Sequence, residues 1–223
     1  MIGARQKYGS VQKAMNTWRD YMVSMGFGYQ LGIDLPGEKR GMIPNAQYYD
    51  KAYRRSWNGL TIISISIGQG EVTATPLQIA NLGATIANRG YFVTPHVVKE
   101  IEGESIDSIY TTRRYTKVDK GHYEEVVQGM RSAVLGGTCR TANIPELEIC
   151  GKTGTAQNHG KDHSAFMGFA PMNNPKIAIA VYVENGGWGA TYGVPIGKLM
   201  IEKYLTGKLT AEDEALATDI QNR

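Results

Sequence analysis

Three apolar runs follow one another in the last third of the chain, and they limit the possible fold more than any other feature. The runs cover residues 147–156, 164–170 and 177–183, and short segments with Gly, Pro and Asn lie between them. Runs of this length with such boundaries are typical of β-strands, and short connections favour an antiparallel meander. We therefore expect a largely antiparallel sheet in this part of the chain.

Four further segments have the apolar periodicity of helices. In the first of them, apolar residues recur every three or four positions until Gly26, and in the second Pro76 occupies the first helical position. The four segments cover residues 10–25, 76–87, 123–134 and 194–205. Helices packed on a largely antiparallel sheet give a predicted fold class of α/β, or more narrowly α+β.

Three other segments are predicted to be less regular. Residues 91–101 suit one or two short strands interrupted at Pro95, and the polar residues 102–120 suit an exposed excursion. Residues 210–223 are polar and acidic, and we expect them to form a flexible tail.

Composition excludes several classes of function. The 223 residues are 42% hydrophobic, which is enough for the core of one domain. With 24 basic and 21 acidic residues and no basic run among aromatics, a nucleic-acid partner is not expected. No apolar run approaches the ~20 residues of a membrane span, and no signal peptide is evident, so we expect this chain itself to be soluble.

Cysteine and histidine give no metal site. The two cysteines, Cys139 and Cys150, lack metal-ligand spacing, and they are either disulfide-bonded or two partly buried free thiols. The four histidines are scattered along the sequence. We therefore predict no metal and no cofactor.

The stretch Lys152, Thr153, Gly154 and Thr155 is the main candidate for chemistry. An ammonium group followed by hydroxyls can bind a substrate carboxylate, and the glycine lets a ligand backbone approach closely. Lys-Thr-Gly is also one of three active-site elements of penicillin-binding proteins and serine β-lactamases, beside Ser-x-x-Lys and Ser-x-Asn. The alternative for so short a string is an ordinary polar strand end.

The wider sequence resembles the C-terminal part of the transpeptidase domain of class B penicillin-binding proteins, and among them the penicillin-binding protein 2 group of elongation transpeptidases. The matching segments follow one another in the expected order and are residues 27–35, 57–61, 67–70, 73–78, 151–157, 166–171 and 183–187. The resemblance assigns residues 1–209 to this domain. It also implies the fold shared by penicillin-binding proteins and serine β-lactamases, here truncated on its N-terminal side.

The resemblance implies a D,D-transpeptidase that cross-links peptidoglycan stem peptides through an acyl-serine and is acylated by β-lactams. Lys152, Thr153 and Gly154 then match the catalytic Lys-Thr-Gly strand, and Thr155 matches a substrate-binding residue. The backbone N–H of Thr155 would be one donor of the oxyanion hole.

Two strings satisfy the other two elements literally, and we interpret both as chance matches. They are residues 10–13 for the nucleophile and 56–58 for Ser-x-Asn, and both lie downstream of the places that the resemblance gives these elements. The nucleophilic serine is therefore expected outside this chain, which alone should have no turnover. His163 is either a residue on the substrate side or an ordinary loop histidine.

Other functions remain open from the sequence: a serine β-lactamase or carboxypeptidase, a sensor domain that binds β-lactam or cell-wall peptide, or a noncatalytic scaffold. The implied partners are peptidoglycan stem peptides, β-lactam antibiotics and membrane proteins of the elongation complex. The implied location is the periplasmic side of the inner membrane, reached through an N-terminal anchor that this chain lacks.

Overall fold

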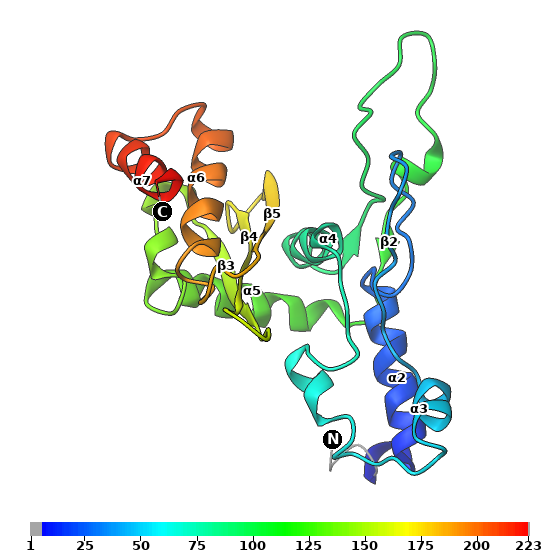
Figure 1. The fold of residues 1–223 in the computed structure, drawn as a ribbon. Coiled ribbons are helices and arrows are strands. Elements are labelled where there is room, and N and C mark those ends of the chain that lie inside the picture. Colours follow the sequence, from blue (N-terminus) through cyan, green and yellow to red (C-terminus); the bar gives the residue numbers. More distant parts are fainter. Residues whose placement is uncertain (1–5, 223) are drawn as a thin grey trace. The chain divides into compact units, whose positions relative to one another are not determined.

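A computed structural model describes residues 6–222, which form two compact units. The first unit contains residues up to Gln78 and Val93–Val118, and the second contains Ile79–Phe92 and the residues from Asp119 onward. Figure 1 shows the path of the chain.

The second unit is built on an antiparallel meander in the order β3-β4-β5. Its strands are β3 (Cys150–Ala156), β4 (His163–Ala170) and β5 (Ile177–Val183). In the register, Thr155 lies opposite Ser164 across β3 and β4, and Ala165 lies opposite Tyr182 across β4 and β5. The three apolar runs therefore form the sheet that the sequence predicts.

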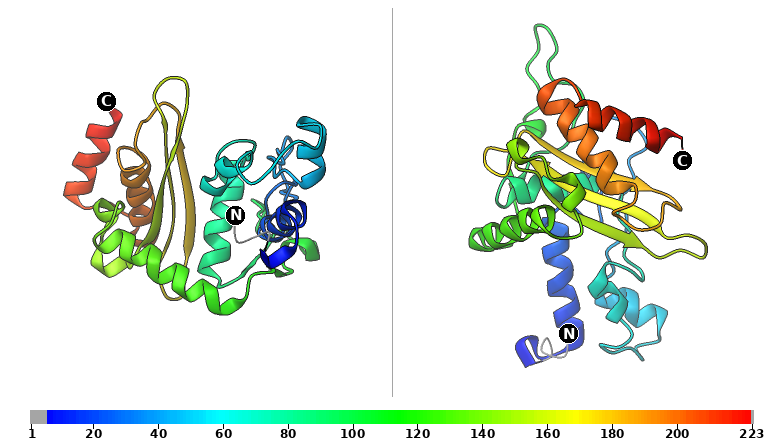
Figure 2. Two further views of the ribbon diagram at one scale, coloured as in Figure 1. Left: turned by 90° about the horizontal axis from the view of Figure 1, so that it is seen from below. Right: turned by 90° about the vertical axis from the view of Figure 1, so that its left-hand side faces the viewer.

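Helices cover this sheet in the second unit. Helix α6 (Gly193–Thr206) packs on β4 and β5, and α5 (Lys120–Leu135) packs against β3 (Figures 1 and 2). Gly83 of α4 (Pro76–Ala87) lies close to the Met167 side chain of β4. These helices match three of the four predicted segments, and Asp119 caps α5 through a bond from the backbone N–H of Gly121 to its carboxylate.

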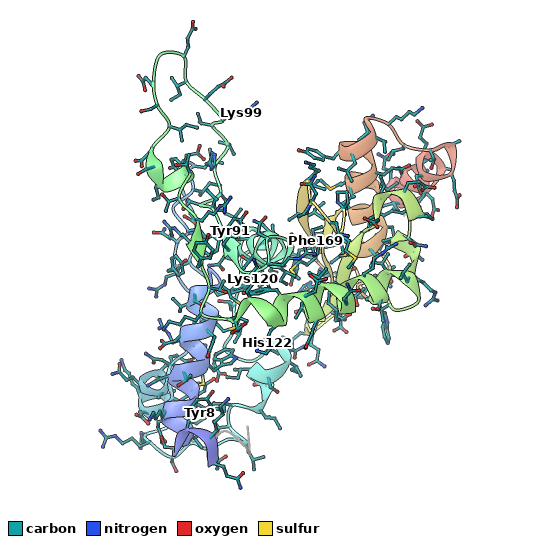
Figure 3. All side chains as sticks on the ribbon, turned by 180° about the vertical axis from the view of Figure 1, so that it is seen from behind. Tyr8, Tyr91, Lys99, Lys120, His122 and Phe169 are labelled. Atoms are coloured by element: carbon teal, nitrogen blue, oxygen red, sulfur yellow. The ribbon has the colours of Figure 1, made fainter. Side chains whose placement is uncertain are left out.

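The core of the second unit lies between α6 and the sheet. Phe166 is 1% exposed, and glycines on three elements leave room for its ring: Gly151, Gly168 and Gly197. Phe169, labelled in Figure 3, is also fully buried on β4. The buried members of the main cluster are Val134, Cys139, Ala142, Leu147, Ile149, Phe166, Ala170, Ile179, Val194 and Ile201.

The polar segment after residue 209 contains a helix that the sequence analysis did not predict. Helix α7 (Ala211–Gln221) starts at Thr210, whose side chain accepts a hydrogen bond from the backbone N–H of Asp213. The Asp213 carboxylate lies 2.6 Å from the Lys198 ammonium on α6, and both side chains are largely buried. The Asp213–Lys198 pair thus joins α7 to α6, and Leu216, Ala217 and Ile220 on the same face of α7 are half-buried. The expected flexibility of this segment stays a prediction.

The first unit packs α2 (Val11–Ser24) against α3 (Ala46–Ala52). Helix α2 is the first predicted helix, whereas α3 was not predicted. Tyr49 of α3 is fully buried, and its hydroxyl donates to the Glu71 carboxylate at 2.7 Å. The buried residues of this small core are Met15, Ala46, Tyr49, Trp57, Ile62 and Ile65.

Residues 91–120, which were predicted to be less regular, contain only short elements before α5 begins: β1 (Tyr91–Phe92), the 3-10 helix η2 (Ser108–Tyr110) and β2 (Arg114–Tyr115). Elsewhere the chain forms the 3-10 helices η1 (Ile63–Ile67), η3 (Arg140–Ala142) and η4 (Pro145–Leu147). The exposed loop that carries Lys99 lies between β1 and η2 (Figure 3). The predicted strand pattern of residues 91–101 is thus reduced to the two residues of β1 and an isolated bridge between Ile101 and Glu104.

Candidate active site

The Lys-Thr-Gly-Thr stretch occupies the middle of β3. In the three-stranded sheet, β3 is an edge strand whose neighbour is β4. Lys152 and Thr155 are exposed, and Thr153 and Gly154 are half-buried. The strand therefore presents an accessible edge at the residues that the sequence analysis selected, which an extended ligand backbone can approach.

Strand alternation separates the four residues into two pairs. Lys152 and Gly154 point to one face of the sheet, and Thr153 and Thr155 point to the other. The Lys152 ammonium donates to the Thr153 carbonyl at 2.8 Å. It borders a groove of about 410 Å³ that is otherwise largely apolar, with Ile86, Met130 and Met167 in its wall. A cation beside an apolar wall can attract a carboxylate and bind the apolar part of the same ligand.

The Thr153 hydroxyl has a partner from outside the sheet. Its Oγ1 lies 3.0 Å from Oγ1 of Thr138, which follows the glycines that end α5. The next residue, Cys139, is fully buried, and burial raises the pKa of its thiol above the ordinary value. A thiol in this state stays protonated at neutral pH, so Cys139 is not a nucleophile beside β3.

The Thr155 hydroxyl contacts the loop between β5 and α6. The backbone N–H of Gly189 donates to Thr155 Oγ1 at 3.3 Å. Both hydroxyls of β3 are therefore oriented by neighbouring loops. Sequence reasoning did not select Thr138 or Gly189, although both follow glycine-rich stretches, at residues 136–137 and 186–187.

The other residues considered from the sequence have local structural contacts. Ser10 caps α2 by accepting from the Lys13 N–H at 3.1 Å, and Asn58 accepts from the Leu60 N–H within a turn. Both belong to the first unit, whereas Lys152 belongs to the second. His163 Nδ1 accepts from the backbone N–H of Asn185 at 2.9 Å, so its ring is held by the loop that follows β5.

The two thiols are free and buried. Burial raises the pKa of Cys150 to about 11. The sequence left open whether Cys139 and Cys150 form a disulfide or remain free thiols, and in the structure they are free thiols. Within residues 6–222, no group of three or more His, Cys, Asp or Glu side chains is arranged to hold a metal ion.

Comparison with known proteins gives the family of the chain. Residues 6–202 match the family model of the penicillin binding protein transpeptidase domain. The chain belongs to this family. The resemblance drawn from the separate motifs is thereby confirmed, and the Lys-Thr-Gly stretch lies within the matched range.

Three known proteins are similar to this chain over most of its length. The peptidoglycan D,D-transpeptidase MrdA of Acinetobacter baumannii is 39% identical over 199 residues, which cover 79% of this chain and 29% of the relative. The crystal structure of Pseudomonas aeruginosa PBP2 in complex with WCK 5153 has a TM-score of 0.75 at 36% identity, covering 90% of this chain and 44% of that one. PBP2 of Helicobacter pylori, in a complex with MreC, has a TM-score of 0.72 at 28% identity, with 90% and 37% covered.

The chain spans only about a third of the length of the curated relatives that it matches, between 29% and 35% for the first three. The fold of penicillin-binding protein transpeptidases is shared, as the sequence analysis predicts. None of the helices described between residues 6 and 222 has the length and apolar character needed to cross a bilayer.

Proposed function

We propose that this chain supplies the Lys-Thr-Gly part of the active site of a peptidoglycan D,D-transpeptidase. The observation that carries the proposal is the placement of Lys152–Thr155 on the accessible edge of β3, within the range matched by the transpeptidase family. The name of the A. baumannii relative, a peptidoglycan D,D-transpeptidase, supports the reaction. The substrate is then a peptidoglycan stem peptide, and β-lactams are inhibitors that acylate the same site.

The geometry of β3 suits the carboxylate end of an extended peptide. A substrate that adds to the free edge of the strand gains main-chain hydrogen bonds, and Gly154 permits its close approach. The Thr153 and Thr155 hydroxyls, on one face of β3, supply donors for the carboxylate, and Lys152, on the other face, adds positive charge to the same strand. The Thr155 N–H would stabilise the developing oxyanion once the acyl carbonyl is attacked.

The nucleophilic serine belongs, in this proposal, to a part of the protein outside this chain. Ser10 already caps a helix and Ser56 precedes a turn, so we assign neither to the reaction. A carboxylate clamp and half of an oxyanion hole cannot form an acyl intermediate without a nucleophile and its base. The chain by itself is therefore inactive.

The partners and location follow from the same assignment. Because H. pylori PBP2 forms a complex with MreC, we propose that the longer protein joins an elongation complex of membrane proteins. It works on the periplasmic side of the inner membrane, attached by an N-terminal anchor that lies outside this chain.

The test is labelling with a reporter penicillin, followed by intact-mass measurement and peptide mapping. We expect no adduct on the cooperatively folded chain, and one adduct on an upstream serine in the protein extended to the full transpeptidase domain. Lys152→Ala in the extended protein should lower the acylation rate ~100-fold, the scale of losing an electrostatic contact to the transition state. The matched control is Lys161→Ala, which removes an exposed lysine from the turn after β3. An adduct on Ser10, or equal labelling of both variants, would overturn the proposal.

A further inference from the structure

A buried serine holds the loop between β5 and α6, residues 184–192, against the sheet. Ser164 of β4 is 0% exposed, and its register partner on β3 is Thr155. Its hydroxyl donates to the Trp188 carbonyl at 2.8 Å and accepts from the Gly193 N–H at 3.0 Å. One hydrogen bond goes to Trp188 in the loop, and the other goes to Gly193, the first residue of α6. This one side chain therefore holds both ends of the segment 188–193.

The segment that Ser164 fixes lies directly on the proposed substrate strand. A Cβ atom on Gly189 would lie 2.5 Å from the Gly154 carbonyl oxygen and 2.7 Å from that of Ala165. Real Cβ atoms do not come so close to backbone oxygen, so only glycine permits this contact. The close approach brings the Gly189 N–H to 3.3 Å from Thr155 Oγ1.

This contact determines what the Thr155 hydroxyl can do. A backbone N–H can only donate, so toward Gly189 the hydroxyl must accept. Its single proton then points elsewhere and remains available to a ligand on the exposed side of β3. A hydroxyl with this orientation is a donor suited to a carboxylate.

We propose that Ser164 is a positioning residue for the reaction. It holds Gly189 on Thr155, and it thereby directs the Thr155 proton to the terminal carboxylate of a stem peptide or β-lactam. This inference rests on the function proposed above for β3. Ser164 is not itself a nucleophile, because it is buried and its proton is bonded to the Trp188 carbonyl.

The first measurement concerns the loop alone and needs no enzymatic activity. Amide hydrogen exchange of this chain, read by NMR, should be at least ~10-fold faster at Gly189 and Gly193 in Ser164→Ala, with the other strand amides of β4 and β5 unchanged. Ser132→Ala, at an exposed position on α5, is the matched control. If Ser164→Ala does not melt cooperatively, Thr155→Val tests the next contact in the series: it removes the acceptor for the Gly189 N–H and should speed exchange at Gly189 but not at Gly193. Unchanged exchange at Gly189 would overturn the positioning role.

The second measurement concerns the carboxylate and uses the protein extended to the full transpeptidase domain. The acylation rate is compared for a penicillin and for its methyl ester, which has no charged carboxylate. Ser164→Ala should slow acylation by the free acid ~10-fold, the scale of weakening a hydrogen bond to a charged group, and that by the ester less than about twofold. An equal loss for acid and ester would mean a general structural defect and would overturn the inference. If the wild type reacts with neither compound, the proposed function fails, while the exchange data still decide whether Ser164 holds the loop.

Discussion

The hydroxyl of Thr138, in the loop after α5, lies within hydrogen-bond distance of the Thr153 hydroxyl on β3, with 3.0 Å between their Oγ1 atoms. Thr138 is exposed, so the contact adds little to folding, but it restricts the rotation of a hydroxyl that we assign to substrate binding. Thr138→Val should therefore leave the free energy of unfolding within about 0.5 kcal/mol of the wild type. The same change should lower the rate of penicillin acylation of the extended protein about threefold to tenfold, since one hydrogen bond is worth about 1 kcal/mol.

Thr138→Ser is the matched control for this pair, because it keeps the hydroxyl and loses only the methyl group. It should restore most of the acylation rate. Equal rates for the valine and serine variants would show that the hydroxyl contact does not orient Thr153.

Two helical glycines should respond to alanine in opposite directions. Gly129 on α5 has no neighbouring atom within 4 Å of the place that a methyl group would occupy, so Gly129→Ala should stabilise the chain by about 0.5–1 kcal/mol through helix propensity. Gly197 on α6 faces the buried Phe166 ring, which a Cβ atom would overlap. Gly197→Ala should destabilise it by about 1–3 kcal/mol, because overpacking a filled core exceeds the gain in propensity.

Urea unfolding of the wild type and of both glycine variants measures these changes in the free energy of unfolding. Stabilisation by Gly197→Ala would mean that α6 can move away from β4 without cost, contrary to the close packing of these two elements.

The sheet and four helices were predictable because their signals are local. The runs that became β3, β4 and β5 are apolar and end at Gly, Pro or Asn, and α2, α4, α5 and α6 show helical periodicity with recognisable ends. Helix α7 has only three apolar residues on its covered face, Leu216, Ala217 and Ile220, within a polar and acidic sequence. Its contact to α6 depends on the pairing of Asp213 with Lys198, which are 15 residues apart and not related by any periodicity.

The candidate site was predictable in part for the same reason. Lys152–Thr155 form a contiguous motif, whereas Thr138 and Gly189 reach β3 through contacts across 15 and 34 residues of sequence, and Ser164 bonds Trp188 across 24 residues. A serine in an apolar run gives no sign that it will bond a loop more than twenty residues later. Only the register of β3 and β4 places Ser164 opposite Thr155.

The two thiols should be unreactive in the folded chain. Burial raises the pKa of both, that of Cys150 to about 11, so the reactive thiolate is scarce at pH 8 and reagents have no access. A disulfide-exchange reagent such as DTNB should therefore titrate no thiol in native chain and both thiols in guanidinium chloride. Rapid titration of either thiol under native conditions would contradict the burial of that side chain.

Asp213 should be the main electrostatic link between α7 and α6. Its carboxylate is paired with Lys198 at 2.6 Å, and the side chains are only 4% and 13% exposed. Asp213→Asn would leave a largely buried ammonium without its counter-charge, and we expect a loss of about 3 kcal/mol in the free energy of unfolding. Asp219→Asn, near the other end of α7, serves as a comparison that keeps this pair. A loss of less than about 0.5 kcal/mol in Asp213→Asn would mean that Lys198 reaches solvent instead.

Glu202 should give the α6–α7 contact a dependence on pH. Burial and the adjacent Asp213 raise the pKa of Glu202 above its ordinary value of 4.5. Burial opposes ionisation of Asp213 as well, but hydrogen bonds from Lys198 and Glu202 outweigh it and hold the pKa of Asp213 below 3.8. The contribution of Glu202 to the free energy of unfolding is therefore fully present below about pH 4.5, and it is lost as the pH rises through its raised pKa. The contribution of Asp213 to the free energy of unfolding is present above about pH 3.8, and it is lost as the pH falls through its lowered pKa.

Glu202→Gln isolates the effect of the Glu202 proton. The amide is neutral at every pH, and its oxygen can still accept from the Thr210 N–H, as Glu202 Oε1 does at 3.1 Å. Between about pH 5 and pH 8, the free energy of unfolding should decline more in the wild type than in Glu202→Gln, because only the wild type must bury a carboxylate beside Asp213. Glu212→Gln, at an exposed position in the first turn of α7, should retain the wild-type decline. Parallel declines in the wild type and Glu202→Gln, measured by urea unfolding, would assign the pH dependence to other groups.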